Sequence, residues 1–333
     1  MKAAVFEEYG SPDVIKIRNV EKPVPEDDEV LIRVYATTVN RTDCAMLRAR
    51  PFIMRFVTGL FKPNKPIHGT DFAGEIEAVG KEVTSLRVGD RVFGFDDMGL
   101  GSHAEYMTLS EDKALTTIPD NLSWQQAAAS IEGAHYAYNI INKVPLERGQ
   151  KVLVNGADGA IGSAAVQLLK YYEADITAVC HAKNTDLVRL LGAGKVFDYT
   201  KEDFTQSKET YHYIFDTVGK SSFAKCKPLL KPGGAYVFSE LGLMAQNLFL
   251  AFYTPIMAKL SGKQKGKKVV FPVPVDIKRS VLLIKKLSRE GMFKAVIDRK
   301  YALEDIAEAY RYVETGQKTG NVVININSAE EPS

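Results

Sequence analysis

The segment KVLVNGADGAIGSAAVQLLK, residues 151–170, constrains the fold of this chain more than any other. An apolar, strand-like run ends at Asn155, a glycine-rich turn follows, and an amphipathic helical pattern then begins. The turn reads A-x-G-x-x-G, and its small residues would let a pyrophosphate approach backbone N–H groups at the helix start. The alternative is an ordinary strand–helix turn. We expect a dinucleotide to bind along Gly156, Ala157, Gly159, Ala160, Ile161 and Gly162.

Apolar runs and helical patterns alternate on both sides of this turn, from about residue 123 to about residue 240. Such alternation predicts an α/β fold with a Rossmann-like, doubly wound parallel sheet. The expected strands are Val152–Asn155, Ile176–Cys180, Lys195–Phe197, Tyr213–Phe215 and Ala235–Phe238, and the expected helices span 160–172, 184–192 and 221–230.

The first 120 or so residues have a different texture, with β-branched and aromatic runs between Pro and Gly turn signals. Strands are expected at Val30–Val39, Phe72–Val79 and Asp90–Phe95, and Ser123 is the expected N-cap of the following helix. A further helix is expected near 276–290. We therefore divide the chain into a discontinuous β-rich domain, 1–122 with 268–333, and a dinucleotide-binding domain, 123–267.

Composition excludes several classes of function. A net charge of +2 on 333 residues gives no basic excess for nucleic acid. The longest apolar stretch, 248–260, is too short for an integral membrane segment, which needs about 20 residues. The N-terminus lacks the unbroken apolar region of a signal peptide. Three widely separated cysteines fit free thiols in a reducing compartment, so we expect a cytoplasmic protein.

The end of the second expected strand bears on the choice of cofactor. An NAD site usually carries an acid about 20 residues after the glycines, where it binds the ribose 2′-hydroxyl. Here the sequence is Cys180-His181-Ala182-Lys183, without an acid. A cation in that position suits a 2′-phosphate, so NADP(H) is expected over NAD(H). The alternative is that Lys183 is simply a solvated residue at a helix start.

Several blocks together resemble the medium-chain dehydrogenase/reductase superfamily, specifically its zinc-free quinone oxidoreductase branch. They are MKAAVFEEYGSPDVI, VNRTD (39–43), GTDFAGEIEAVG (69–80), VGDRVFGF (88–95), NGADGAIGSAAVQLLK (155–170), FDTVG (215–219) and the closing GNVVI. The resemblance implies that the β-rich domain is GroES-like and catalytic, with the cofactor cleft between the two domains. It also implies a homodimer.

The same resemblance bears on zinc. In zinc-dependent members a Cys stands at the position of Asn40 and a His at that of Thr70, and neither residue here is a good ligand. His68 is displaced by two positions, Cys44 is expected to be packed, and residues 95–113 contain no cysteine for a second zinc site. We therefore expect no zinc. Without that Lewis acid, quinones and activated alkenes are more plausible substrates than simple alcohols.

The resemblance also assigns roles to single residues. Asn40 and Thr42 would be catalytic, near the nicotinamide and the substrate, although Thr42 could instead be a strand-end residue facing its own backbone. Asp43 is expected to pair with a cation, and His135 to be a packed, hydrogen-bonded residue of a helix. The remaining expected cofactor contacts are Lys183, Tyr199, Val218, Ser239, Leu241 and Asn321, the last at a position where relatives commonly carry Lys.

These features lead to one favoured function and two alternatives. The favoured function is the NADPH-dependent, zinc-independent reduction of quinones or α,β-unsaturated carbonyl compounds. The alternatives are an enoyl-thioester reductase and a cofactor-binding interaction protein without activity, as in zeta-crystallin-like relatives. The long segment 241–268 could cap the cleft, form a subunit interface or lie on an anionic membrane surface.

Overall fold

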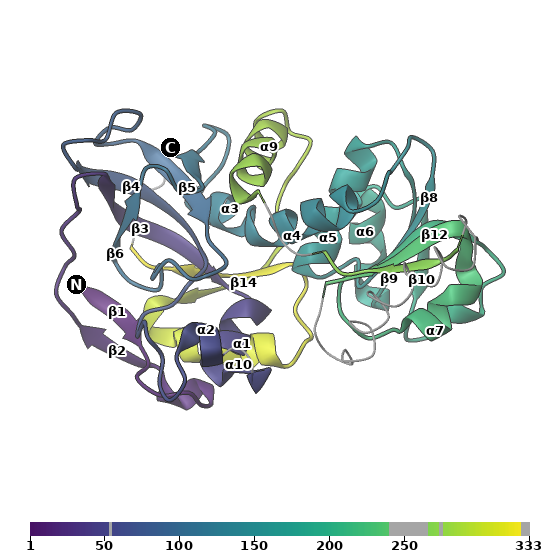
Figure 1. Ribbon diagram of the computed structural model, residues 1–333, viewed down its shortest axis with the longest axis horizontal. Coiled ribbons are helices and arrows are strands. Elements are labelled where there is room, and N and C mark those ends of the chain that lie inside the picture. The colour runs from purple at the N-terminus through teal and green to yellow at the C-terminus, as the bar shows by residue number, and fades with distance from the viewer. Residues whose placement is uncertain (53–54, 240–265, 273–275, 328–333) are drawn as a thin grey trace. The chain divides into compact units, whose positions relative to one another are not determined.

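The computed structural model describes residues 1–52, 55–239, 266–272 and 276–327 (Figure 1). The chain forms two compact units, Met1–Glu132 with Asp276–Ser333, and Gly133–Val275. The first unit extends to Glu132, whereas the sequence predicted that it ends at residue 122. It is longer because α3 (Trp124–Ala129) packs on strands of the first unit. Ser123 caps α3 as expected, its side chain accepting a hydrogen bond from the Gln126 amide at 3.2 Å.

The first unit contains a seven-stranded sheet and a separate hairpin (Figure 1). The hairpin joins β1 (Lys2–Val5) to β2 (Lys16–Asn19). The large sheet has the order β14 (Ile297–Ala302), β15 (Asn321–Asn325), β3 (Glu29–Val39), β4 (Asp71–Val79), β5 (Arg91–Phe95) and β7 (Leu115–Thr117), while β6 (Tyr106–Ser110) also pairs with β3. Its pairs are antiparallel except β14–β15, so the β-rich character expected for this part is confirmed.

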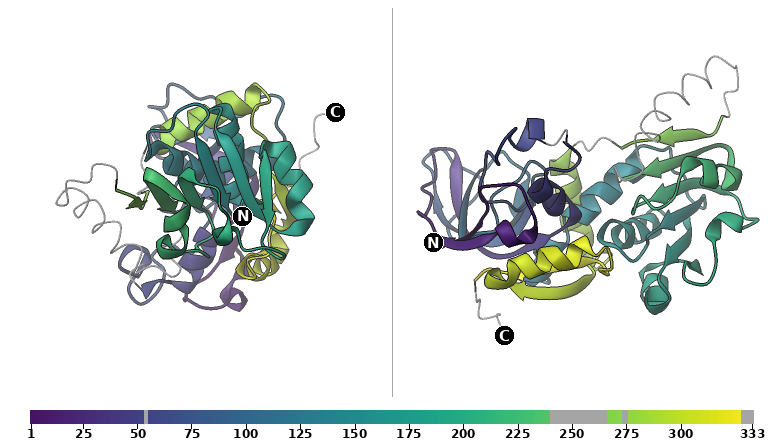
Figure 2. Two further views of the ribbon diagram at one scale, coloured as in Figure 1. Left: turned by 90° about the vertical axis from the view of Figure 1, so that its right-hand side faces the viewer. Right: turned by 90° about the horizontal axis from the view of Figure 1, so that it is seen from below.

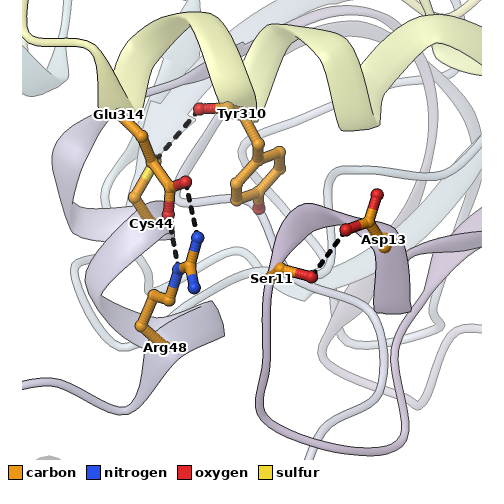
Figure 3. Close-up of polar contacts among 6 residues, drawn as sticks. All are labelled: Ser11, Asp13, Cys44, Arg48, Tyr310 and Glu314. Carbon is orange, nitrogen blue, oxygen red and sulfur yellow. Dashed lines mark hydrogen bonds and ion pairs between the residues drawn. The ribbon is translucent and has the colours of Figure 1, made fainter.

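Alternating side chains of the central strands form the core of this sheet. Val30, Ile32 and Val34 of β3 are fully buried, together with Phe72 and Ile76 of β4. Two helices, α1 (Arg41–Arg48) and α10 (Ile306–Glu314), pack against each other beside the sheet. Figure 3 shows this contact: the Cys44 thiol lies 3.9 Å from the Tyr310 carbonyl, and Arg48 faces Glu314. Cys44 is therefore packed, as expected.

The second unit is built on six parallel strands (Figure 2). Their order is β10 (Lys195–Asp198), β9 (Asp175–Cys180), β8 (Lys151–Asn155), β11 (Tyr211–Asp216), β12 (Leu230–Phe238) and β13 (Lys268–Val270). Helices α5 (Ala160–Tyr171) and α6 (Thr185–Leu191) pack on β8, β9 and β10. This is the doubly wound order, whose direction reverses between β8 and β11, the place where such sheets bind ligands.

Three expectations need correction or comment. The helix expected over 221–230 is shorter: α7 (Phe223–Cys226) gives way to a 3₁₀ turn over Lys227–Leu229 that contains a proline. Strand β13 was not expected, whereas α9 (Ile277–Arg289) confirms the helix near 276–290. Leu241 and most of the segment 241–268 lie outside the described residues. In the described ranges, no helix is long and apolar enough to cross a bilayer.

Candidate functional site

The glycine turn after β8 has the shape that its sequence predicts. Gly156 has φ +81°, and a Cβ there would lie 2.3 Å from Cγ1 of Val218 in the loop after β11. A Cβ on Gly162 would lie 2.0 Å from the Gly156 carbonyl oxygen. Both positions therefore require glycine. Val218, an expected cofactor contact, packs on the turn at the point where the strand order reverses.

Only part of this turn can offer its amides to a ligand. The N–H groups of Gly156 and Ala157 both donate to the Val179 carbonyl, at 3.0 and 2.9 Å, and that of Gly159 donates to Gly156 at 3.1 Å. The expected diphosphate contact of these three amides therefore needs correction. The donors at the start of α5 are Ala160, Ile161 and Gly162, whose N–H groups precede the first intrahelical bond, Ser163 to Gly159.

Gly159 leaves the approach to these three amides open. Among the described residues, a Cβ at this position would have one neighbouring atom within 4 Å, the Gly156 oxygen at 3.5 Å. The first turn of α5 thus presents N–H donors and the positive end of the helix dipole to an accessible surface. This arrangement fits a pyrophosphate group.

The structure brings Lys183 and Tyr199 to one edge of the parallel sheet. Lys183 is exposed in a 3₁₀ turn directly after β9, and Tyr199 follows β10, with its amide donating to the Cys180 carbonyl at 3.2 Å. The ring of Tyr199, which is 54% exposed, contacts the His181 ring edge-on, with centroids 5.7 Å apart. A cation and an exposed aromatic face therefore lie where the adenosine end of a dinucleotide binds in such sheets.

An acid that the sequence analysis did not consider also lies at this edge. Asp158, in the glycine turn, accepts hydrogen bonds through Oδ2 from the His181 amide at 3.1 Å and from Asn184 Nδ2 at 2.7 Å. This acid comes from the loop after β8, and the sequence carries none in the four residues 180–183, at and after the end of β9. Both donors hold this carboxylate in place.

Asp216, at the end of β11, organises the loops on the other side of the turn. Its carboxylate accepts hydrogen bonds from the Gly219 and Ser221 amides at 3.1 and 3.0 Å and from the Tyr236 hydroxyl at 2.7 Å. Burial and the neighbouring Asp216 raise the pKa of Tyr236, so the phenol stays protonated as a donor. The Ser239 amide donates to the Asp216 carbonyl at 3.1 Å. The loops carrying Val218 and Ser239 are thus held by one residue.

In the first unit, the Glu132 carboxylate is the common hydrogen-bond acceptor of Asn40, Thr42 and Thr70. Asn40 and Thr70 stand where the resemblance places the zinc ligands of zinc-dependent relatives. The carboxylate accepts hydrogen bonds from Asn40 Nδ2 at 2.9 Å, Thr70 Oγ1 at 2.8 Å and Thr42 Oγ1 at 2.7 Å. Thr42 belongs to the first turn of α1 and faces Glu132, not its own backbone. Asn40 and Thr70 therefore act as hydrogen-bond donors to a buried acid.

Lys318, which follows α10, supplies a cation to the same network. Its Nζ donates to Asn40 Oδ1 at 3.1 Å and to the Gly320 carbonyl at 2.7 Å. Burial lowers the pKa of Lys318 to about 8, with Glu132 opposing the shift. Asn40 therefore lies between an acid and a cation, and its amide dipole points the correct way for both.

Two further carboxyl groups complete the network. Asp71 accepts hydrogen bonds from the Thr38 amide at 2.8 Å and from the Thr38 hydroxyl, and burial together with Glu132 raises its pKa to about 7. Asp43 accepts a hydrogen bond from the Asn40 amide at 2.8 Å, but its buried Oδ1 has no partner among the described residues. Burial and Glu132 raise its pKa well above the usual range. Among the described residues no ion pair of Asp43 with a cation is found, contrary to expectation, and its burial favours the protonated form of this acid.

The other candidate residues have structural contacts. Asn321 is buried in β15, and its Nδ2 donates to the Val296 carbonyl at 3.1 Å, while its Oδ1 has no partner within the described part of the chain. His68 is buried against Phe6, and burial lowers its pKa to about 4. His135 is fully buried in α4 (Glu132–Asn142) beside Asn139, as expected for a packed helix residue.

Only some residues of this hydrogen-bond network reach solvent. Asn40, Asp43, Thr70, Asp71 and Glu132 are buried, whereas Thr42 and Lys318 are half-buried. Thr42 and Lys318 are therefore the members of this network that solvent can reach. Across the described ranges, no group of three or more His, Cys, Asp or Glu residues is arranged to hold a metal ion.

Two family models match parts of this chain. Residues 26–120 match the family model of the alcohol dehydrogenase GroES-like domain, and residues 191–324 match the model described as zinc-binding dehydrogenase. The 2-methylene-furan-3-one reductase of Solanum lycopersicum is 31% identical over 98% of this chain and 79% of its own length. The chloroplastic NADPH-dependent alkenal/one oxidoreductase of Arabidopsis thaliana is 30% identical over 97% of this chain and 79% of its own length.

A solved structure supports the same fold. The quinone oxidoreductase from Coxiella burnetii superposes with a TM-score of 0.81, at 24% identity, over 98% of this chain and 99% of that chain. The α/β fold, with a Rossmann-like parallel sheet and a GroES-like β-rich part, is thus confirmed. The chain belongs to the medium-chain dehydrogenase/reductase superfamily of oxidoreductases, among relatives named quinone and alkenal/one oxidoreductases.

Proposed function

We propose that this protein is an NADPH-dependent reductase of quinones or α,β-unsaturated carbonyl compounds. The observation that carries the proposal is the hydrogen bond from Thr42 to Glu132, which connects a buried network of carboxyl groups to a half-buried hydroxyl. A reductase that delivers hydride to a conjugated carbonyl needs such a proton source. The relatives named above include reductases of this kind.

The choice of NADPH rests on the edge of the sheet beyond β9. Lys183 offers a cation for the 2′-phosphate, and the exposed ring of Tyr199 offers a surface for the adenine. Asp158 lies at the same edge, where hydrogen bonds from the His181 amide and from Asn184 Nδ2 hold its carboxylate in place, so the cation of Lys183 must outweigh this acid. The amides of Ala160, Ile161 and Gly162 would bind the pyrophosphate.

The bound cofactor would supply the hydride. The substrate must also gain a proton, and the Thr42 hydroxyl can pass one from Glu132 when that acid is protonated. Burial raises the pKa of Glu132, while its bonds to Thr42, Thr70 and Asn40 oppose the shift. Solvent at the half-buried Thr42 hydroxyl would return the proton to Glu132, while the charge of Lys318, beside Asn40, would stabilise the carboxylate in between. Hydride and proton together complete a two-electron reduction.

This mechanism uses no metal, and the donor set around Glu132 does not fit zinc. Asn40 and Thr70 turn their hydrogens, not lone pairs, toward the carboxylate, and Lys318 adds a positive charge beside them. Zinc prefers thiolate, imidazole and carboxylate ligands. Hydrogen-bond donors would instead stabilise charge that develops on the substrate oxygen.

The direct test is NADPH oxidation by the purified full chain across a panel of quinones and enones. Turnover of these substrates, faster with NADPH than with NADH, is the expected result. Turnover of an enoyl-thioester but not of the free enone would indicate an enoyl-thioester reductase instead. Tight NADPH binding with no turnover of any substrate would indicate a cofactor-binding interaction protein without enzymatic activity. We also propose a homodimer in the cytoplasm, which light scattering and fractionation would check.

A further inference from the structure

The segment between Asp43 and Asp71 combines positive charge with exposed aromatic rings. It contains no acidic residue and five cations, at positions 48, 50, 55, 62 and 65. Phe52, Phe56 and Phe61 are 64%, 72% and 86% exposed, and Leu60 is 44% exposed. Exposed apolar side chains that gather with cations mark interaction sites more often than scattered ones do.

The tip of this segment is held firmly in place. The Tyr9 hydroxyl donates to the Gly59 carbonyl at 2.7 Å and lies 2.8 Å from Thr58 Oγ1. The Asn64 amide closes the turn by donating to the Thr58 carbonyl at 2.7 Å. Gly59 has φ +127°, and a Cβ there would lie 2.0 Å from the Lys62 carbonyl oxygen. Leu60, Phe61 and Lys62 therefore project from a fixed turn after α2 (Arg55–Thr58).

A cavity of about 450 Å³ opens beside this turn, lined by Tyr9, Gly10, Arg48, Ala49, Arg50, Phe52 and Arg55. Arg48 is neutralised there by a bidentate pair with Glu314, at 2.7 and 2.8 Å (Figure 3). The Arg55 guanidinium lies over the rings of Tyr9 and Phe52, 5.0 and 5.7 Å from their centroids. Arg50 is exposed. Arg50 and Arg55 thus give the cavity positive charge, and the segment itself contains no acid that could neutralise it.

We propose that this face binds the surface of an anionic phospholipid bilayer. We call it the Phe61 surface and define it by Arg50, Phe52, Arg55, Phe56, Leu60, Phe61 and Lys62. The charge suits anionic headgroups, and the cavity suits a headgroup phosphate held between Arg50 and Arg55.

Protruding phenylalanines favour a bilayer over a hydrophilic acidic partner, because the acyl boundary removes them from water. The attachment is peripheral. It is independent of the reductase function proposed above.

The test is co-sedimentation of the full chain with vesicles of phosphatidylcholine alone and of phosphatidylcholine mixed with phosphatidylserine. We expect binding to the mixed vesicles only, weakened by added salt. Each cation near an anionic leaflet contributes about a fivefold gain in partitioning. The charge reversal Lys62→Glu should therefore weaken binding about fivefold or more. The double variant Phe56→Ser/Phe61→Ser should weaken it at least as strongly.

Matched controls come from exposed residues outside the Phe61 surface. Val88→Ser removes an apolar side chain that is 62% exposed, and Lys300→Glu reverses an exposed charge. Both should bind vesicles like the parent chain, and thermal unfolding should confirm that every variant is folded.

Three outcomes would overturn the proposal. The first is equal binding to both vesicle types. The second is that the control variants weaken binding as much as the variants of the Phe61 surface do. The third is no vesicle binding, with Phe56→Ser/Phe61→Ser instead dissociating an oligomer in light scattering, which would make this face a contact between copies.

Discussion

Asn40 and Glu132 are 92 residues apart in the chain, and Asn40 Nδ2 donates to Glu132 Oε2 at 2.9 Å. The other end of the same amide accepts a hydrogen bond from Lys318. Neither bond can form if the amide is turned over, so the acid and the cation fix its orientation together. Asn40 is in this way a spacer that holds two titrating groups at set positions in the first unit.

Replacement of Glu132 by Gln tests the proposed proton route. The amide keeps the shape of the side chain but cannot give up a proton, so kcat/KM for quinone or enone reduction should fall about a hundredfold. Steady-state kinetics with NADPH would measure this, and the NADPH-induced rise in melting temperature should be unchanged. Glu308→Gln, at an exposed acid of α10, is the matched control and should behave as the parent chain. A Glu132→Gln variant with full activity would remove Glu132 from the mechanism.

Lys318 should set the alkaline limb of the pH–rate profile. Its pKa is lowered from 10.5 to about 8, so the ammonium form is lost as the pH rises through 8. If the charge of Lys318 supports the proton transfer at Glu132, kcat/KM should decline above that pH, by tenfold per pH unit at most. Lys318→Met should remove this limb and lower the plateau, whereas Lys318→Arg should keep the charge and move the limb to higher pH. A limb that persists unchanged in Lys318→Met belongs to another group.

The two glycines of the turn should respond differently to the same substitution. In Gly162→Ala the new methyl meets the Gly156 carbonyl oxygen, so the free energy of unfolding should fall by about 1–3 kcal/mol. In Gly159→Ala the methyl makes only an ordinary contact, with the Gly156 oxygen at 3.5 Å, so stability should change by less than about 0.5 kcal/mol, while the NADPH-induced thermal shift should disappear. Chemical denaturation and thermal shift measure the two effects. A normal NADPH shift in Gly159→Ala would show that the cofactor does not approach this turn.

Lys183 should decide between the two nicotinamide cofactors. Loss of a charge-assisted contact to the 2′-phosphate should weaken NADPH binding in Lys183→Ala about tenfold or more. NADH binding should stay the same, because NADH lacks that phosphate. Titrations of both cofactors would show this, with Lys201→Ala, whose side chain is 78% exposed, as the control. Equal weakening of both cofactors would contradict a specific role for Lys183.

Local patterns were sufficient to predict most of the fold. The alternation of apolar strands and amphipathic helices identified the parallel sheet because each βα unit buries its own apolar face. The helix over 221–230 was too long because Pro228 ends it early, a signal that was present in the sequence. Strand β13 is only three residues long and carries no alternation to detect.

The candidate site was predictable only in part, because side-chain partners from distant segments are not encoded locally. Glu132 had a signal: it is the single acidic residue in the stretch 124–141, which contains no Lys or Arg. Lys318, set between Gly316 and Gly320, looks like any solvated loop lysine. Only the folded chain brings it to Asn40. The amides of Gly156 and Ala157 were assigned to a ligand because the sequence does not show that Val179 already uses them.

The two hydrogen bonds of Asp158 have a mechanical consequence for the second unit. They tie the glycine turn to the segment that carries Lys183, so these two stretches of chain, about 25 residues apart, should move as one rigid piece. An attempt to convert the cofactor preference by redesigning residues 181–184 would then disturb the pyrophosphate cradle as well. Specificity and affinity for the dinucleotide cannot be engineered separately while Asp158 joins them.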